Sequence, residues 1–117
     1  MTKEIIGAQG EVTIIKIDAI PVSAKTKPAT ERNAKGHIII SHSESGHHHV
    51  VTGGEVWERT DVADGMQEFY AIFTKAERLV QDAPTPHEGY DLHPGTYNFR
   101  VAREYDPFME QARRVAD

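Results

Sequence analysis

Short apolar runs with a period of two residues, separated by glycine and proline, most constrain what this chain can fold into. The run at 67–73, Gln-Glu-Phe-Tyr-Ala-Ile-Phe, is one example, and the β-branched run Ile38-Ile39-Ile40 is another. Side chains alternate between the two faces of a strand, so this pattern predicts half-buried β-strands. We expect strands at residues 11–18, 37–42, 47–52, 55–60, 67–73, 77–80 and 96–103.

Two segments depart from the strand pattern. Residues 21–36 contain almost nothing to bury and predict a mobile polar loop, or else a basic lid that closes on a nucleotide-like anion. Asp106 and Pro107 suit the start of a helix, and an apolar stripe at helical spacing extends this prediction over 106–116. We therefore expect a single domain over 1–117: a small, mainly antiparallel β-barrel or sandwich with one short C-terminal helix.

The composition excludes several classes of function. The net charge of -5 argues against a nucleic-acid or anionic-membrane binder, because both need clustered positive charge. The chain has no cysteine, which excludes disulfides and thiolate chemistry. No apolar run approaches the roughly 20 residues of a membrane span, and the first residues are too polar for a signal peptide. We expect a cytoplasmic protein.

Three consecutive histidines, His47-His48-His49, lie on one of the expected strands. Strand alternation places His47 and His49 on one face, roughly 7 Å apart, and His48 on the other. Two imidazoles at that spacing are able to bind one metal ion, and a zinc or iron site usually takes three protein ligands. The third ligand is then His87 or His93, which lie in the proline-rich segment 82–95.

The two glycines at 53–54 predict a hairpin turn, which pairs strand 47–52 with strand 55–60. Glu58 then lies opposite His49, and a connection at 43–46 places His42 opposite His47. On this register four side chains converge on one face, with His48 on the reverse face beside Arg59: His42, His47, His49 and Glu58.

The chain resembles a group of small, uncharacterised bacterial and phage proteins. The resemblance is carried by Glu44-Ser45-Gly46-His47-x-His49, residues 76–79, His87, residues 92–97 and Arg103-Glu104-Tyr105-Asp106-Pro107. It covers roughly residues 38–117. Because His87 matches a patterned position and His93 replaces a proline, the resemblance favours His87 as the third ligand. The ligand set is also similar to that of cupin barrels, although the spacing of the acid and of the Pro-x-Gly turn differs.

Besides a ligand-sensing module with the basic loop 21–36 as its lid, two functions follow as alternatives. In the first, a divalent zinc or iron ion on His47, His49 and His87 serves a metal-dependent hydrolase for a small or anionic substrate. Glu44 or Glu58 accepts the proton, and Arg100 or Arg103 holds an anionic group. In the second, a non-catalytic, phage-associated protein has structural histidines, and it binds a partner or forms a homo-oligomer through the C-terminal helix.

Overall fold

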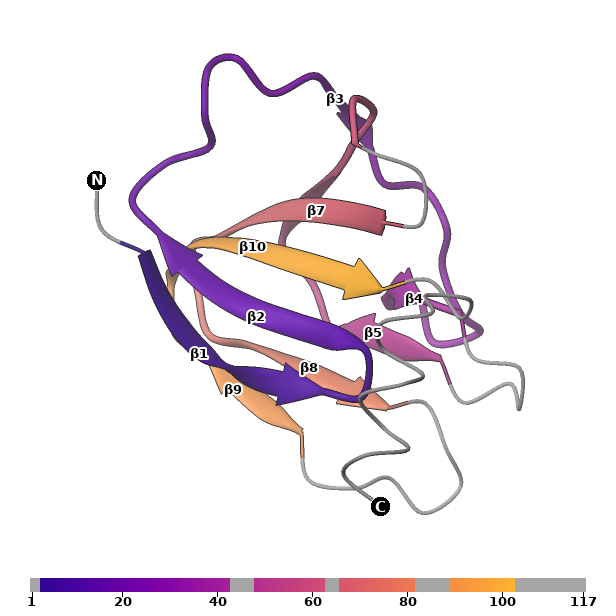
Figure 1. The fold of residues 1–117 in the computed structure, drawn as a ribbon. Helices are drawn as coiled ribbons and strands as arrows, with labels where there is room; N and C mark the ends of the chain where they lie inside the picture. Colours follow the sequence, from indigo (N-terminus) through magenta and orange to yellow (C-terminus); the bar gives the residue numbers. More distant parts are fainter. Residues whose placement is uncertain (1–2, 43–47, 63–65, 82–88, 103–117) are drawn as a thin grey trace, which may run out of the picture.

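Two antiparallel β-sheets lie face to face in the computed structural model, which describes residues 3–42, 48–62, 66–81 and 89–102 (Figure 1). The large sheet has the order β1 (Lys3–Gln9), β2 (Val12–Ile17), β10 (Gly95–Ala102), β7 (Met66–Phe73), β6 (Glu55–Arg59) and β3 (Thr26–Pro28). The small sheet has the order β4 (Ile38–Ser41), β5 (His49–Val51), β8 (Glu77–Gln81) and β9 (Tyr90–Leu92).

The prediction of a mainly antiparallel β fold is confirmed. The two sheets are not closed into a barrel. Of the two predicted architectures, the fold is therefore the sandwich. Each predicted strand is present with its ends shifted by a few residues at most. The predicted C-terminal helix at 106–116 lies outside the described residues. Among those residues, no helix has the length and hydropathy to span a bilayer.

The core lies between the sheets and takes alternate residues from each strand. On β10, Tyr97, Phe99 and Val101 point inward, whereas Arg100 is exposed on the outer face. The strand period used for the prediction therefore separates the inner from the outer face. The two sheets contribute to one cluster: Val12, Ile14, Ile38, Ile40, Val51, Val56, Phe69, Ala71, Phe73, Leu79, Leu92, Tyr97, Phe99 and Val101.

Three strands were not predicted from the sequence: β1, β3 and β9. β1 is an exposed edge strand, which pairs with β2 across a turn at Gly10, where φ is +57°. β3 lies inside the segment predicted to be a loop and pairs with the edge of β6, where Pro28 is tolerated because an edge strand needs no donor on its outer side. Segment 21–36 is thus in part a strand.

The prediction of a hairpin at Gly53-Gly54 is wrong. β5 belongs to the small sheet and β6 to the large one, so the two glycines connect the sheets instead of pairing neighbouring strands. Both glycines are close to other side chains: a Cβ on Gly53 would lie 2.9 Å from a carboxylate oxygen of Glu77, and one on Gly54 would overlap the ring of Phe73. The lack of space for a Cβ beside Glu77 and Phe73 accounts for glycine at both positions without a hairpin turn.

Candidate functional site

His49, the described member of the predicted metal pair, is enclosed in the sandwich. Its side chain points inward from β5, and the residue is 4% exposed. The Nδ1 atom lies 2.8 Å from Oε1 of Gln9, and Nε2 lies 3.4 Å from Oε2 of Glu11. Because the amide nitrogen of Gln9 donates to the carbonyl of Leu79 at 3.2 Å, the amide oxygen is the atom that faces His49, and Nδ1 is the donor.

Glu11 connects the turn between β1 and β2 to the small sheet. It accepts a short hydrogen bond from the hydroxyl of Ser41 and faces the ring of His49. Burial acts to raise the pKa of Glu11, but hydrogen bonds from His49 and Ser41 outweigh burial and lower this pKa to about 2. Glu11 is therefore an ionised carboxylate held between two elements. We call Gln9, Glu11, Ser41 and His49 the His49 cluster.

Gly10 closes the remaining space beside the imidazole. A Cβ at Gly10 would lie 2.9 Å from Nε2 of His49 and 3.1 Å from its Cε1. The backbone of the β1–β2 turn therefore packs directly on the ring edge that carries Nε2. Sequence reasoning missed Gln9, Glu11 and Ser41, since the pairing of the strands that brings them to His49 has no local signal.

Of the other predicted site residues, some lie outside the described part of the chain, and Glu58 lies away from His49. His47, His87, Glu44 and Arg103 lie outside the described residues. Glu58 lies in the large sheet, where it accepts from Gln67 at 2.9 Å and pairs with Lys27 at 3.5 Å. The predicted pairing of Glu58 with His49 is wrong, because β6 pairs with β7 and β5 pairs with β8.

His42 and His48 lie together instead of on opposite faces. Their ring centroids are 4.8 Å apart in an edge-on contact, and Nε2 of His42 lies 2.7 Å from a carboxylate oxygen of Glu31. His48 was predicted to lie beside Arg59, and this placement depended on the wrong hairpin. Within the described ranges, no three histidine, aspartate or glutamate side chains are arranged to hold a metal ion.

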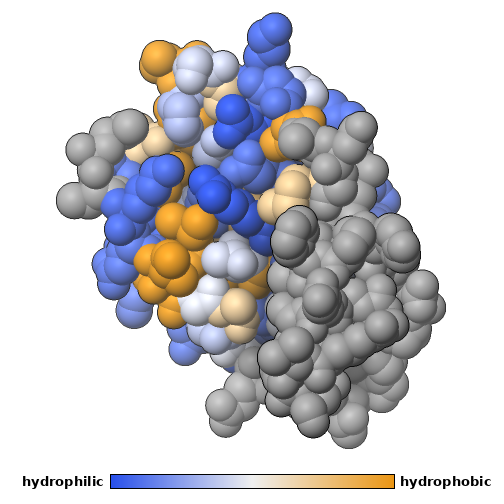
Figure 2. Space-filling view, viewed as in Figure 1, coloured by the Kyte–Doolittle hydropathy of each residue, from blue (hydrophilic) through white to orange (hydrophobic). Residues whose placement is uncertain are grey.

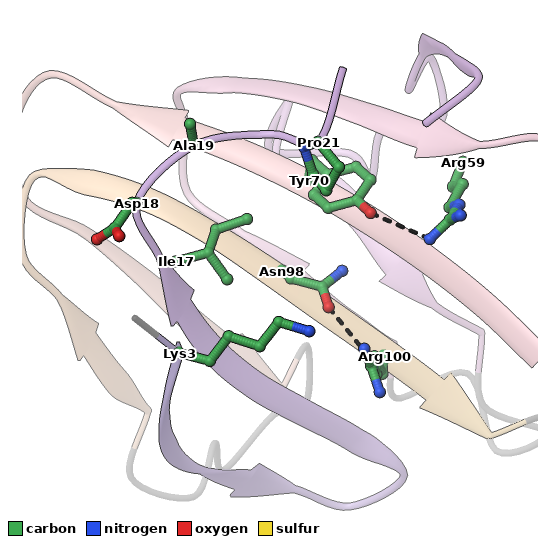
Figure 3. A pocket seen from close by; sticks show the side chains of 9 residues that line it. All are labelled: Lys3, Ile17, Asp18, Ala19, Pro21, Arg59, Tyr70, Asn98 and Arg100. Atoms are coloured by element: carbon green, nitrogen blue, oxygen red, sulfur yellow. Dashed lines mark hydrogen bonds between the residues drawn. The ribbon is translucent and has the colours of Figure 1, made fainter. Parts of the chain in front are cut away.

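A pocket of about 90 Å³ opens on the outer face of the large sheet (Figure 3). Tyr70 and Asn98 are neighbours in register on β7 and β10, and although both point away from the core, they are only 3% and 4% exposed. Pro21, from the connection that follows β2, lines the pocket together with Tyr70. The full lining is Lys3, Ile17, Asp18, Ala19, Pro21, Arg59, Tyr70, Asn98 and Arg100.

Two arginines beside the pocket share one carboxylate. Oε1 of Glu68 forms an ion pair with Nε of Arg100, and Oε2 forms one with Nη1 of Arg59, each at 3.1 Å. Arg59 also donates to the hydroxyl of Tyr70 at 3.2 Å, and its Nε lies 2.6 Å from Asp61. The hydrogen bond with Asp61 raises the pKa of Arg59 and lowers the pKa of Asp61. Sequence analysis singled out Arg100 for an anionic group, whereas Arg59 and Lys3 were not assigned to one.

The comparisons with known proteins identify a family. Neither a curated protein nor a solved structure matches the chain. The model of one family, described as a domain of unknown function, DUF8820, matches residues 8–102. This span contains the last two residues of β1 and every other strand of both sheets, and it agrees with the expected membership of an uncharacterised group. The chain therefore belongs to the DUF8820 family.

Proposed function

We propose that this chain is a non-catalytic binding domain in which the histidines stabilise the sandwich. The observation that carries the proposal is the enclosure of His49. Its two ring nitrogens face Gln9 and Glu11, and the Gly10 turn packs on the same edge. His49 thus connects the small sheet to the β1–β2 turn of the large sheet.

A metal ligand needs a lone pair that points at open space, with the ion about 2 Å away. In His49, Nδ1 donates to Gln9, so only Nε2 is left to face a metal ion. That atom is directed at the Glu11 carboxylate beside Gly10. Metal binding at His49 would require the turn to move and Glu11 to lose its partner, and this cost favours the structural role.

Elemental analysis tests the proposal on protein purified without a metal-affinity tag. We expect no near-stoichiometric zinc or iron, and a thermal midpoint that a chelator leaves unchanged. His49→Ala should lower the free energy of unfolding by about 2–4 kcal/mol, because Glu11 and Gln9 lose a buried partner. His93→Ala is the matched control, since His93 is exposed.

The competing proposal is a metal-dependent hydrolase that uses His47, His49 and His87, with Glu44, Glu58 and Arg103 around the substrate. The motif resemblance and the similarity to the cupin ligand set support it. Near-stoichiometric zinc or iron that is lost in His47→Ala/His49→Ala and retained in His93→Ala would replace our proposal with this one.

A further inference from the structure

We infer that the pocket on the outer face of the large sheet binds a small organic carboxylate. The pocket brings together side chains from five strands, including Lys3 from β1, Tyr70 from β7 and Arg100 from β10. Figure 3 shows the ammonium group of Lys3 extended toward Asn98 and Arg100. The inference rests on the proposed function, because it names the ligand class of a binding domain.

The donors available to a ligand belong to Lys3, Arg100 and Tyr70. Arg100 uses its Nε for Asn98 and Glu68, both at 3.1 Å, which leaves its two terminal nitrogens without a partner among the described residues. Within the same part of the chain, no ion pair engages Lys3. The hydroxyl of Tyr70 accepts from Arg59 and so retains its own proton to donate.

The charges around the pocket disfavour a dianion. The three positive charges of Lys3, Arg59 and Arg100 are matched by the three negative charges of Glu68, Asp61 and Asp18. Glu68 and Asp61 are engaged by the arginines, and the carboxylate of Asp18 is directed away from Lys3 and Arg100 (Figure 3). Lys3 and the terminal nitrogens of Arg100 keep donors for a planar carboxylate, which adds one negative charge to this balanced set, whereas a phosphate dianion would add two.

The remaining lining selects an organic ligand. Ile17, Ala19 and Pro21 form an apolar wall beside the polar groups of Tyr70 and Asn98. The volume of about 90 Å³ is several times the roughly 10–15 Å³ of cavity that a single water molecule needs. The pocket therefore fits a carboxylate with a short alkyl chain, such as butyrate.

Titration of the full chain with butyrate, followed by NMR at constant ionic strength, tests the inference. We expect saturable shifts centred on Ala19 and the side-chain amide of Asn98, with a dissociation constant on the order of 1 mM. Arg100→Gln should weaken binding by about tenfold or more, because a charge-assisted hydrogen bond pair is lost. Lys3→Gln, on an exposed edge strand, provides a second variant that leaves the interior untouched.

Arg78→Gln is the matched control, since it removes one positive charge from the small sheet, where Arg78 pairs with Asp91. The control should bind butyrate as the unchanged chain does. The inference would be overturned by shifts that fail to saturate, or by variants Arg100→Gln and Lys3→Gln that bind butyrate as tightly as the unchanged chain does. Binding of inorganic phosphate that is tighter than binding of butyrate would overturn it as well. None of these results bears on the metal content, so failure of this inference and failure of the proposed function are distinguishable.

Discussion

Nε2 of His49 and a carboxylate oxygen of Glu11 lie 3.4 Å apart, and this contact joins the small sheet to the first turn of the large sheet. The other ring nitrogen donates to Gln9. Both ring nitrogens of His49 therefore face side-chain oxygens, one of an amide and one of a carboxylate. The hydrogen bonds that Glu11 accepts are strongest while its carboxylate is ionised.

Acid should therefore weaken the sandwich through Glu11. Its pKa is lowered in the folded state from an ordinary value of 4.5 to about 2, so the unfolded chain takes up the proton first as the pH falls. The contribution of Glu11 is complete above pH 4.5 and is lost as the pH falls toward 2. We expect a loss of about 2–3 kcal/mol in the free energy of unfolding over this window, measured by urea denaturation.

The Glu11→Gln variant should be less stable at pH 6 and should lose this part of the pH dependence. Glu55→Gln, at an exposed position, should retain the slope of the unchanged chain. Parallel pH profiles for the unchanged chain and Glu11→Gln would contradict the assignment of the slope to Glu11.

Gly10→Ala should be more costly than Gly36→Ala, although both glycines have a positive φ, +57° and +81°. Backbone strain alone amounts to about 1 kcal/mol at such positions. At Gly36 an added Cβ meets nothing within 4 Å, whereas at Gly10 it meets the ring of His49. We expect losses of about 1 kcal/mol for Gly36→Ala and about 2–3 kcal/mol for Gly10→Ala. Equal losses would show that the ring of His49 moves aside freely.

The strands and their faces could be predicted from the sequence because alternation is a local property. Phe69, Ala71 and Phe73 follow one another at intervals of two, and all three are core residues. Which strand pairs with which is not local. The connection at Gly53-Gly54 passes from one sheet to the other, although the same dipeptide also suits a hairpin, and the predicted site around His49 and Glu58 depended on that choice.

The missed strands have a related cause. β1 is exposed along most of its length, so its sequence lacks the alternation that a buried face imposes. Its position becomes evident only from its pairing with β2, through which Gln9 and Glu11 reach His49. The outer pocket was missed for the same reason, since it joins residues from strands far apart in the sequence.

Glu68→Gln should destabilise the chain more than Asp91→Asn, although each variant removes one carboxylate from an ion pair. Glu68 is buried and holds both Arg59 and Arg100, so its loss leaves two guanidinium groups facing a neutral amide. Asp91 pairs with Arg78 at the surface, where its side chain is 81% exposed. We expect losses of about 1–3 kcal/mol and at most about 0.5 kcal/mol, respectively, by urea denaturation. Similar losses in the two variants would mean that Glu68 contributes no more than a surface pair.

Phe99→Ala should be the most damaging of these substitutions. Phe99 is fully buried at the centre of the large sheet, between β2 and β7, and its ring stacks on Tyr97 with centroids 6.4 Å apart. Removing the ring loses the transfer free energy of a large side chain and leaves a cavity, which together amount to about 3–5 kcal/mol. Ile5→Ala is the control, because Ile5 is 73% exposed on the edge strand and should change the stability by less than about 0.5 kcal/mol. Thermal and urea denaturation measure both variants, and a loss below about 1 kcal/mol for Phe99→Ala would contradict the placement of Phe99 in the core.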